Sequence, residues 1–467
     1  KGDVSGNITP SSMQSYFGRI TYAYDNKYLF QATLRNDNSS LFAPDKRSGY
    51  FPAVSAGWVI SNESFWGLEA VNNLKFRASW GENGSTSNIQ AGQWKALVTK
   101  DGLKYPDALG NYHTVGELKA LPNEDITWET TEQTDLGFDL RAFNNKLSLG
   151  FDYYKKVTRD LLTPSSPPLS TGYPAPYANA GDVTNKGIEI ELGWRETQRQ
   201  LNYGINLNLT TINNEVTFLN PLLTRVDGAS LPVLGTITSF ELGKPVWYFR
   251  GYKTDGIFQN QAQVDAYKTS LGSVTTWNPT PGSPIVVDAN GDGDITDQDK
   301  TYIGDPHHDL LIASTIDFEY KGFDLKIFLQ GAFGGENFIA LAIVDNRPSN
   351  RPEYFFTDRW TGEGSTNSFP KATYSDPIFY SSDLMVQDAS YVKIKQIQLG
   401  YSLKPELIRQ MGMSSLRIYL SLDDYFTFTK YKGIDPEVGS FSNNSQGIDR
   451  GLYPIASRFM TGLSVTF

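Results

Sequence analysis

Apolar residues alternate with polar or small ones at a period of two along most of this chain. From Leu147 to Tyr153 every second residue is apolar or aromatic, and Ser148, Gly150 and Asp152 stand between them. Alternation of this kind predicts a β-strand with one apolar face and one polar face. About thirteen segments follow the pattern, near 16–25, 27–37, 50–61, 72–82, 128–142, 145–158, 184–196, 201–212, 309–320, 323–333, 389–402, 414–424 and 456–467. The chain is therefore predicted to be all-β.

The predicted strands are long enough to cross a membrane. Most of them run 10 to 14 residues, whereas strands of soluble proteins have about 5–6 residues and a tilted bilayer crossing needs about 9–11. The longest apolar run, 338–344, is too short for a transmembrane helix. Within 389–402 the apolar positions change parity between Ile394 and Ile397, which predicts a β-bulge.

Short and long connections alternate between the predicted strands. The short ones include Asp25-Asn26, Asn144-Asn145, Lys321-Gly322 and the link 196–200. The long ones cover 38–49, 83–127, 159–183, 213–308, 334–388 and 425–455. Strict alternation places every long connection at the same end of the sheet. This layout is typical of an outer-membrane β-barrel with short periplasmic turns and long extracellular loops, and it predicts a periplasmic C-terminus.

Composition agrees with an all-β chain and restricts its function. Aromatic residues make up 13% of the chain, with 26 Tyr and 27 Phe, and 42 residues are Gly. The net charge of −10 argues against a nucleic acid partner, because no basic stripe is present to neutralise phosphates. Cys is absent and only three His occur; no catalytic triad, P-loop, dinucleotide fingerprint or zinc motif is present. We therefore predict no enzyme activity.

Seven stretches in the same order resemble the SusC/RagA-type TonB-dependent transporters of Bacteroidetes outer membranes. They are 50–58 (YFPAVSAGW), 74–84 (LKFRASWGENG), 128–137 (WETTEQTDLG), 179–189 (NAGDVTNKGIE), 288–293 (DANGDG), 390–400 (SYVKIKQIQLG) and 433–437 (GIDPE). Members of that family have a 22-stranded barrel, an N-terminal plug domain and a TonB box. The resemblance therefore implies that this chain is the C-terminal part of such a barrel. The first nine or so strands, the plug and the TonB box are then expected to lie outside it, as in a fragment or a processed chain.

The resemblance also implies a function and partners. It predicts TonB-dependent active import of a nutrient, an oligosaccharide or an oligopeptide, across the outer membrane. The implied partners are a SusD-like surface lipoprotein that acts as a lid, the TonB complex acting through the missing N-terminal part, that N-terminal barrel and plug portion itself, and the lipid bilayer. Two alternatives stay open: a passive porin or surface-binding barrel without energy coupling, and a soluble β-sandwich module.

Residues 1–467 are expected to form one barrel portion, with long extracellular loops near 83–127, 213–308, 334–388 and 425–455. Aromatic side chains in these loops could stack on sugars, hold a peptide or pack against the lid, and the sequence does not choose among these roles. The aromatic residues concerned are Trp94, Tyr105, Trp247, Tyr248, Trp277, Tyr354 and Trp360. The substrate-binding residues are therefore left unassigned.

The stretch 288–299 has the ligand spacing of a calcium loop. Asp288, Asn290 and Asp292 occupy positions 1, 3 and 5, Asp294 position 7 and Asp299 position 12, with a glycine at position 6. Position 12 is Asp where Glu is usual, and no clear helix flanks the loop. We predict a structural Ca²⁺ that stiffens the loop 213–308; the alternative is a metal-free turn, since Asp, Asn and Gly are also common turn residues.

Overall fold

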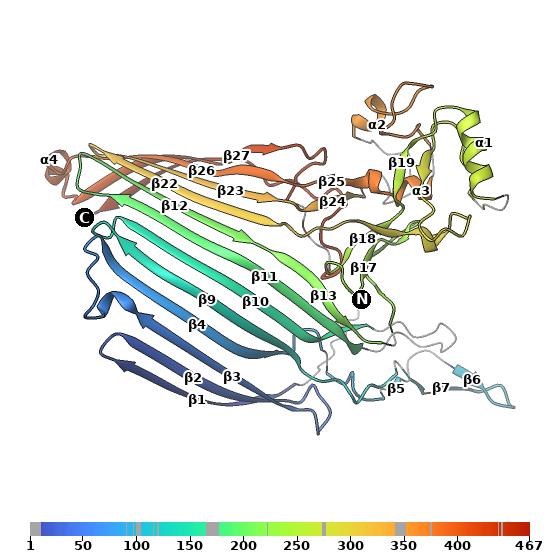
Figure 1. The fold of residues 1–467 in the computed structure, drawn as a ribbon, viewed down its shortest axis with the longest axis horizontal. Coiled ribbons are helices and arrows are strands. Elements are labelled where there is room, and N and C mark those ends of the chain that lie inside the picture. The colour runs from blue at the N-terminus through green and yellow to red at the C-terminus, as the bar shows by residue number, and fades with distance from the viewer. Residues whose placement is uncertain are drawn as a thin grey trace.

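The main feature of the fold is one antiparallel sheet of fourteen strands, called the wall below, which Figure 1 shows as a curved sheet of tilted strands. The computed structural model of the chain describes residues 11–89, 91–96, 98–99, 104–114, 116–118, 121–164, 177–221, 223–272, 277–340, 352–373, 376–437, 439 and 442–467. The wall strands are β1 (Met13–Tyr24), β2 (Tyr28–Ser39), β3 (Ser48–Val59), β4 (Val71–Ser85), β9 (Glu129–Ala142), β10 (Leu147–Pro164), β11 (Tyr177–Glu196), β12 (Leu201–Thr211), β13 (Asn213–Leu219), β22 (Leu310–Tyr320), β23 (Phe323–Phe333), β26 (Tyr391–Ser402), β27 (Ser415–Thr429) and β29 (Arg458–Thr466). All thirteen predicted segments are strands of this wall.

The order of strands in the wall follows the order in the chain, and the pairing is antiparallel throughout. β12 and β13 are one strand interrupted at Ile212, since β11 pairs with both. Among the described residues, β1 and β29 each pair with one wall strand only. The wall is therefore an open sheet with two free edges.

The alternation in the sequence gives the wall two chemically distinct faces. On the apolar face, the rings of Phe138 and Phe151 stack at 5.6 Å between centroids across β9 and β10. On the polar face, the Arg77 guanidinium lies 2.5 Å from the Asp152 carboxylate. Because successive side chains of a strand point to opposite faces, a continuous run of pairs in register keeps the two sets apart.

The tight connections form because their residues tolerate left-handed backbone. Asp25 and Asn26 have φ of 52° and 51°, and Lys321 and Gly322 have φ of 49° and 90°. Positive φ at both central residues is the geometry of the type I′ turn, whose twist matches that of the flanking strands. In Figure 1 the tight turns lie at the left end of the wall and the long connections at the right end.

The long connections contain secondary structure that the sequence did not predict. Their strands are β5 (Val98–Thr99), β6 (Lys104–Pro106), β7 (Tyr112–Thr114), β8 (Glu117–Leu118), β14 (Val226–Asp227), β15 (Ser230–Leu231), β16 (Gly235–Thr236), β17 (Thr238–Phe240), β18 (Tyr248–Gly251), β19 (Thr254–Ile257), β20 (Pro284–Val286), β21 (Thr301–Gly304), β24 (Glu336–Ile339), β25 (Val386–Asp388) and β28 (Ile448–Asp449). Within the described residues the helices are α1 (Gln261–Ser270), α2 (Tyr354–Thr357), α3 (Pro377–Tyr380) and α4 (Pro405–Ile408), and the 3₁₀ turns are η1 (Ile60–Asn62), η3 (Asp297–Asp299), η4 (Asp383–Met385) and η5 (Arg409–Met411). None of these helices, within the described ranges, is long and apolar enough to span a membrane. β10, β11 and β27 also continue into stretches predicted as loops, 159–183 and 425–455.

The largest buried cluster lies in the long connections. Phe249, Phe338, Phe355, Phe379 and Ile448 pack together in it, although they come from three connections that are far apart in the sequence. β24 and β28 pair in parallel and join two of these connections directly. We call the described parts of 223–308, 334–388 and 430–455 the cap, because they share this core.

A second buried cluster joins the connections 38–49, 83–127 and 159–183, which are not part of the cap. It contains Phe42, Phe51, Ile126 and Trp128, with 4.8 Å between the ring centroids of Phe42 and Trp128. Trp128 is only 7% exposed, so it belongs to this packed core and is unavailable to a membrane interface.

The predicted β-bulge is confirmed in β26, where it changes which face of the sheet the following residues point to. The β26–β27 register passes from Ile394↔Phe426 to Gln396↔Asp423, and the β23–β26 register shifts at the same place. Lys395 has no register partner on either neighbouring strand, and Asp424 and Tyr425 of β27 have none on β26. The extra residue turns Gln396 toward the polar face that Lys393 already occupies, which explains the change of parity in the sequence.

A glycine on the polar face makes room for an ion pair across three strands. Gly137 on β9 is in register with Arg77 on β4 and with Asp152 on β10. The Arg77–Asp152 pair therefore passes over position 137. A Cβ atom there would overlap the Asp152 carboxylate and the Phe151 carbonyl oxygen.

We expect Gly137→Ala to destabilise the protein by about 1–3 kcal/mol, the usual cost of overpacking a close contact. Gly150→Ala is the matched control, because a Cβ at that polar-face position would meet Glu191 at an ordinary 3.6 Å. Urea unfolding of both variants measures the difference. Equal midpoints for the two variants would contradict the role given to Gly137.

Candidate functional site

The polar face of the wall carries charged side chains that are arranged in pairs. Arg77 contacts Asp139 at 3.3 Å and Asp152 at 2.5 Å, and Lys75 contacts Asp139 at 3.4 Å. A hollow of about 360 Å³ lies on this face, and its lining includes Lys75, Arg77, Asp135 and Asp152. The hollow is bordered by groups that water or a polar solute can hydrogen-bond.

The same arrangement recurs at the far side of the wall. Arg417 on β27 donates to both oxygens of Asp324 on β23, at 2.9 and 2.5 Å, and to the Gln398 side chain on the strand between them. A two-point contact between guanidinium and carboxylate is a strong, directional one. Fixed ion pairs thus reinforce the polar face near both edges of the wall.

A charged cluster fastens the loop 430–437 to the polar face. Lys393 on β26 is 3% exposed, and its ammonium lies 2.7 Å from Asp435 and 2.5 Å from Glu437. Lys395, at the bulge, contacts Asp424 at 2.7 Å and Glu437 at 3.5 Å. A buried ammonium needs such partners, because an unpaired buried charge is costly. We call this cluster the latch.

Asp435 is ionised in the latch at neutral pH. Partial burial acts to raise the pKa of its carboxyl, but the Lys393 ammonium and the backbone N–H groups of Glu437 and Ile455 outweigh that effect. The pKa of Asp435 therefore lies below its usual value. Because the folded-state pKa is lowered, the latch contributes its full stability above the ordinary Asp pKa of about 4 and loses it as the pH falls further.

The cap has a hollow of its own, of about 290 Å³. Tyr354 and Phe369 line it together with Gln387, Lys430 and Lys432. The Lys432 ammonium lies 5.2 Å from the centre of the Tyr354 ring and 2.7 Å from Asp358. Aromatic rings beside amide and charged groups can contact both the faces of sugars and the backbone of a peptide.

The aromatic residues predicted as loop candidates now separate by environment. Tyr248 is 1% exposed and donates to Glu241, so it belongs to the cap interior. Trp360 donates to Gln259 across the cap. Tyr105 is 71% exposed, and Tyr354 lines the cap hollow. Burial removes Tyr248 from the residues that a solute can reach, a distinction that the sequence alone did not allow.

The predicted calcium loop is folded as a series of turns. Asp288 accepts hydrogen bonds from the backbone N–H groups of Gly291 and Gly293, at 2.7 and 2.9 Å. Asn290 Oδ1 and Asp292 Oδ1 each accept from the backbone N–H two residues on, both at 2.9 Å. Asp294 Oδ1 accepts from the next backbone N–H, also at 2.9 Å. These amides account for much of the oxygen capacity of the loop.

The two ends of the loop come together at Asp299. This side chain is fully buried and accepts from the backbone N–H groups of Ala289 and Thr296 at 3.0 and 2.7 Å. Burial acts to raise the pKa of Asp288, but the N–H groups of Gly293 and Gly291 and the nearby Asp299 outweigh it, so that pKa lies below its usual value. Across the described ranges, no three His, Cys, Asp or Glu side chains gather into a group able to hold a metal. Calcium binding by Asp288, Asn290, Asp292, Asp294 and Asp299 stays a prediction.

Comparison with known proteins identifies the family. Residues 2–282, more than half of the chain, match the family model described as TonB dependent receptor-like, beta-barrel. The chain belongs to this family. Its members are outer-membrane barrels, which agrees with the two-faced wall, and the family is one of receptors and transporters.

Individual TonB-dependent receptors resemble the chain over nearly its whole length. TonB-dependent receptor P26 of Formosa agariphila is 30% identical over 491 residues, which cover 100% of this chain and 48% of that protein. TonB-dependent receptor SusC of Bacteroides thetaiotaomicron is 29% identical, covering 98% of this chain and 44% of that protein. The chain spans about half the length of these relatives. The resemblance drawn from the sequence motifs is confirmed.

A solved receptor structure shares the fold. The RagAB peptide importer in its closed-closed state superimposes with a TM-score of 0.77 at 23% identity, covering 97% of this chain and 48% of that one. At this identity the likeness speaks for the fold. The predicted architecture, part of a TonB-dependent receptor barrel, is confirmed.

The latch was missed from the sequence, although its parts were visible. Lys393 and Lys395 lie within one motif of the family resemblance, and Asp435 and Glu437 lie within another. Two cations in one motif and two carboxylates in another could have suggested a pair. Nothing in the spacing indicates that the second motif folds back onto the polar face.

We expect Lys393→Met to release the loop 430–437, because Asp435 and Glu437 then lose a buried partner; breaking a buried pair costs about 3–5 kcal/mol. Hydrogen exchange of that loop should accelerate. In the unchanged protein, the protection of that loop relative to the intrinsic exchange rate should also fall as the pH drops below about 4 and approaches the lowered pKa of Asp435. Lys326→Met is the control: Lys326 is exposed on the polar face of β23 and forms no hydrogen bond or ion pair within the described ranges. Unchanged exchange in Lys393→Met would refute the latch.

If the loop 288–299 binds calcium, Ca²⁺ should raise the thermal unfolding midpoint of the protein. At a concentration of one hundred times Kd, a ligand adds about 2.7 kcal/mol. Isothermal titration calorimetry with CaCl₂ after EDTA treatment measures the binding. Asp292→Ala should abolish it, whereas Asp255→Ala, an exposed Asp elsewhere in the cap, should not. Absence of heat and of any midpoint shift in the unchanged protein would select the metal-free turn.

Proposed function

We propose that this chain is part of a transporter that imports a nutrient, an oligosaccharide or an oligopeptide, across the bacterial outer membrane with energy from TonB. The observation that carries the proposal is the two-faced wall with all long connections at one end. In an outer-membrane barrel the apolar face meets lipid and the polar face lines a wet interior. On this basis the cap is extracellular and the tight turns and C-terminus are periplasmic.

The substrate would meet the cap before the wall. The cap hollow at Tyr354, Phe369 and Gln387 is suited to a neutral, hydrogen-bonding oligomer, since it combines aromatic faces with an amide and charged groups. RagAB, which shares the fold, is a peptide importer, which supports the choice of an oligomeric nutrient and leaves the peptide and glycan alternatives for experiment.

The proposed partners follow from the same reading. A SusD-like surface lipoprotein would cover the cap as a lid, and the TonB complex would act through an N-terminal barrel and plug portion outside this chain. The similarity of the chain to SusC supports a lid partner of this kind. Calcium in the loop 288–299 would stiffen the cap and take no part in transport.

Energy coupling separates the proposal from a passive porin. We expect cells that depend on the full-length protein to take up labelled oligosaccharides or oligopeptides only when TonB is present. The same protein reconstituted into liposomes should give no swelling with these solutes. Uptake without TonB, together with liposome swelling, would select the porin instead.

Detergent dependence tests the barrel itself. A wall with an exposed apolar face should aggregate when detergent is removed. A soluble monomer without detergent would instead support the β-sandwich module and overturn the membrane assignment.

A further inference from the structure

Two lysines on the apolar face of the wall oppose each other directly. Lys155 on β10 and Lys186 on β11 are a register pair. Both are exposed, and within the described ranges neither forms a hydrogen bond or ion pair. Both side chains lie on the apolar face, because Lys155 is two residues from Tyr153 along β10 and Lys186 is two residues from Ile188 along β11. Like charges in direct cross-strand opposition are destabilising, so the pair needs an explanation.

Of the neighbouring carboxylates, Glu132 is close enough to interact with the charge of Lys155, but within the described ranges it forms no ion pair with that lysine. Glu132, on β9, accepts from Arg159 at 2.8 Å and from the Trp80 indole at 3.1 Å. Asp182 lies 4.0 Å from the same Arg159. Glu215 on β13 stands opposite Thr184, one step further toward the loops. Two ammonium groups therefore face outward together.

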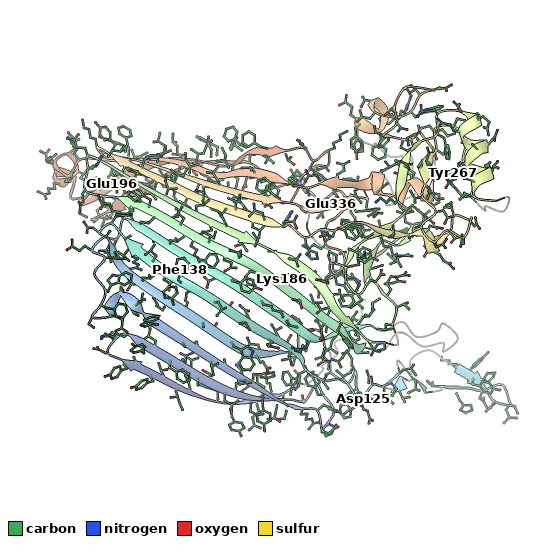
Figure 2. All side chains as sticks on the ribbon, in the orientation of Figure 1. Asp125, Phe138, Lys186, Glu196, Tyr267 and Glu336 are labelled. Atoms are coloured by element: carbon green, nitrogen blue, oxygen red, sulfur yellow. The ribbon has the colours of Figure 1, made fainter. Side chains whose placement is uncertain are left out.

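The pair lies at the border of the apolar face on the loop side. Register links Trp80, Thr134, Lys155 and Lys186 into one row across β4, β9, β10 and β11. Trp marks membrane interfaces, where its ring is apolar and its N–H is polar. Figure 2 shows Lys186 further toward the loop end of the wall than Phe138, which belongs to the apolar belt.

An apolar hollow of about 600 Å³ lies in the belt below the lysine pair. Its floor is the cross-strand pair Ala56 and Ala78, between Phe30 on one side and Leu136 on the other. Large side chains surround the two small ones; those of Tyr28, Trp58, Phe76, Phe138 and Phe151 also line the hollow, together with Leu29, Gly57, Arg77 and Gly137. Phe151 is four residues along β10 from Lys155, about 13 Å at the rise of a strand.

We propose that this surface binds a phosphorylated, acylated glycolipid of the outer leaflet. Its phosphate lies between the ammonium groups of Lys155 and Lys186, and one acyl chain occupies the hollow over Ala56 and Ala78. A phosphate carries between one and two negative charges and accepts charge-assisted hydrogen bonds from both lysines, which removes the repulsion between them. The placement in the outer leaflet rests on the proposed orientation of the cap.

The test is lipid binding to the full-length protein in detergent, followed by native mass spectrometry. The probes are bisphosphorylated lipid A, lipid A freed of phosphate, and phosphatidylethanolamine. We expect the double variant Lys155→Gln/Lys186→Gln to bind lipid A about tenfold more weakly, the effect of about 1.4 kcal/mol. Its binding of dephosphorylated lipid A should not change. Lys156→Gln is the matched control, because Lys156 is the next residue of β10 and points to the opposite face.

The hollow is tested separately. Ala56→Phe should weaken binding of both forms of lipid A, and Ala78→Phe is a second variant should the first fail to fold. Equal lipid A affinity in the lysine double variant and the unchanged protein would overturn the proposal. Displacement of lipid A by inorganic phosphate would also overturn it, since it would show a site for free phosphate. These measurements need no TonB, so their failure leaves the import proposal standing.

Discussion

Backbone hydrogen bonding between neighbouring strands is the constraint on which the rest of this molecule depends. The side-chain period of a strand is two, so register alone decides which face each residue joins. A slip of one residue at β9 would place Asp139 in the row of Phe76 and Phe151, and Phe138 beside the Arg77–Asp152 pair. The row would lose its stacked rings and the polar face would bury an aromatic side chain among charges. Both faces therefore reject the slipped register.

The bulge at Lys395 shows what happens when register is changed locally. One additional residue on β26 lets Lys393, Lys395 and Gln396 all face the polar side. This concentration of positive charge is neutralised by Asp424 on β27 and by Asp435 and Glu437, which return to it from the loop 430–437. The bulge and the latch therefore depend on each other, because the bulge brings the two lysines to the same face and the loop helps to neutralise their charge. The cap, in turn, is held to the wall at a defined point.

The sequence predicted the wall well because each strand carries its own signal. The alternation from Leu147 to Tyr153 and the turn at Lys321-Gly322 are local, so neither depends on what the rest of the chain does. The cap could not be predicted in the same way. Phe249, Phe338 and Phe379 meet in one core from distant connections, and strands of two to four residues are too short to show a period.

For the candidate sites too, some properties could be predicted from the sequence and others only from the structure. For Asp288 and Asp299 the sequence gives the ligand types of a calcium loop, but only the folded backbone shows that amide N–H groups already approach those carboxylates. Tyr248 illustrates the converse, since an aromatic residue in a long loop suggested contact with solute and proved to be buried. Spacing identifies the chemistry of a side chain, and burial decides whether that chemistry is available.

The two faces of the wall use charge differently, and this bears on where a transporter would select its substrate. On the polar face Arg77 and Arg417 are paired with carboxylates across the strands, so their charges are largely neutralised. Charges that are already paired attract water but bind a passing solute only weakly. Weak binding favours passage through a barrel, because tight binding along the path would slow release. In the proposed transporter, selection would then belong to the cap, where Tyr354, Gln387 and Lys430 border a hollow. The unpaired lysines on the apolar face lie outside that path, and they act on the surrounding lipid.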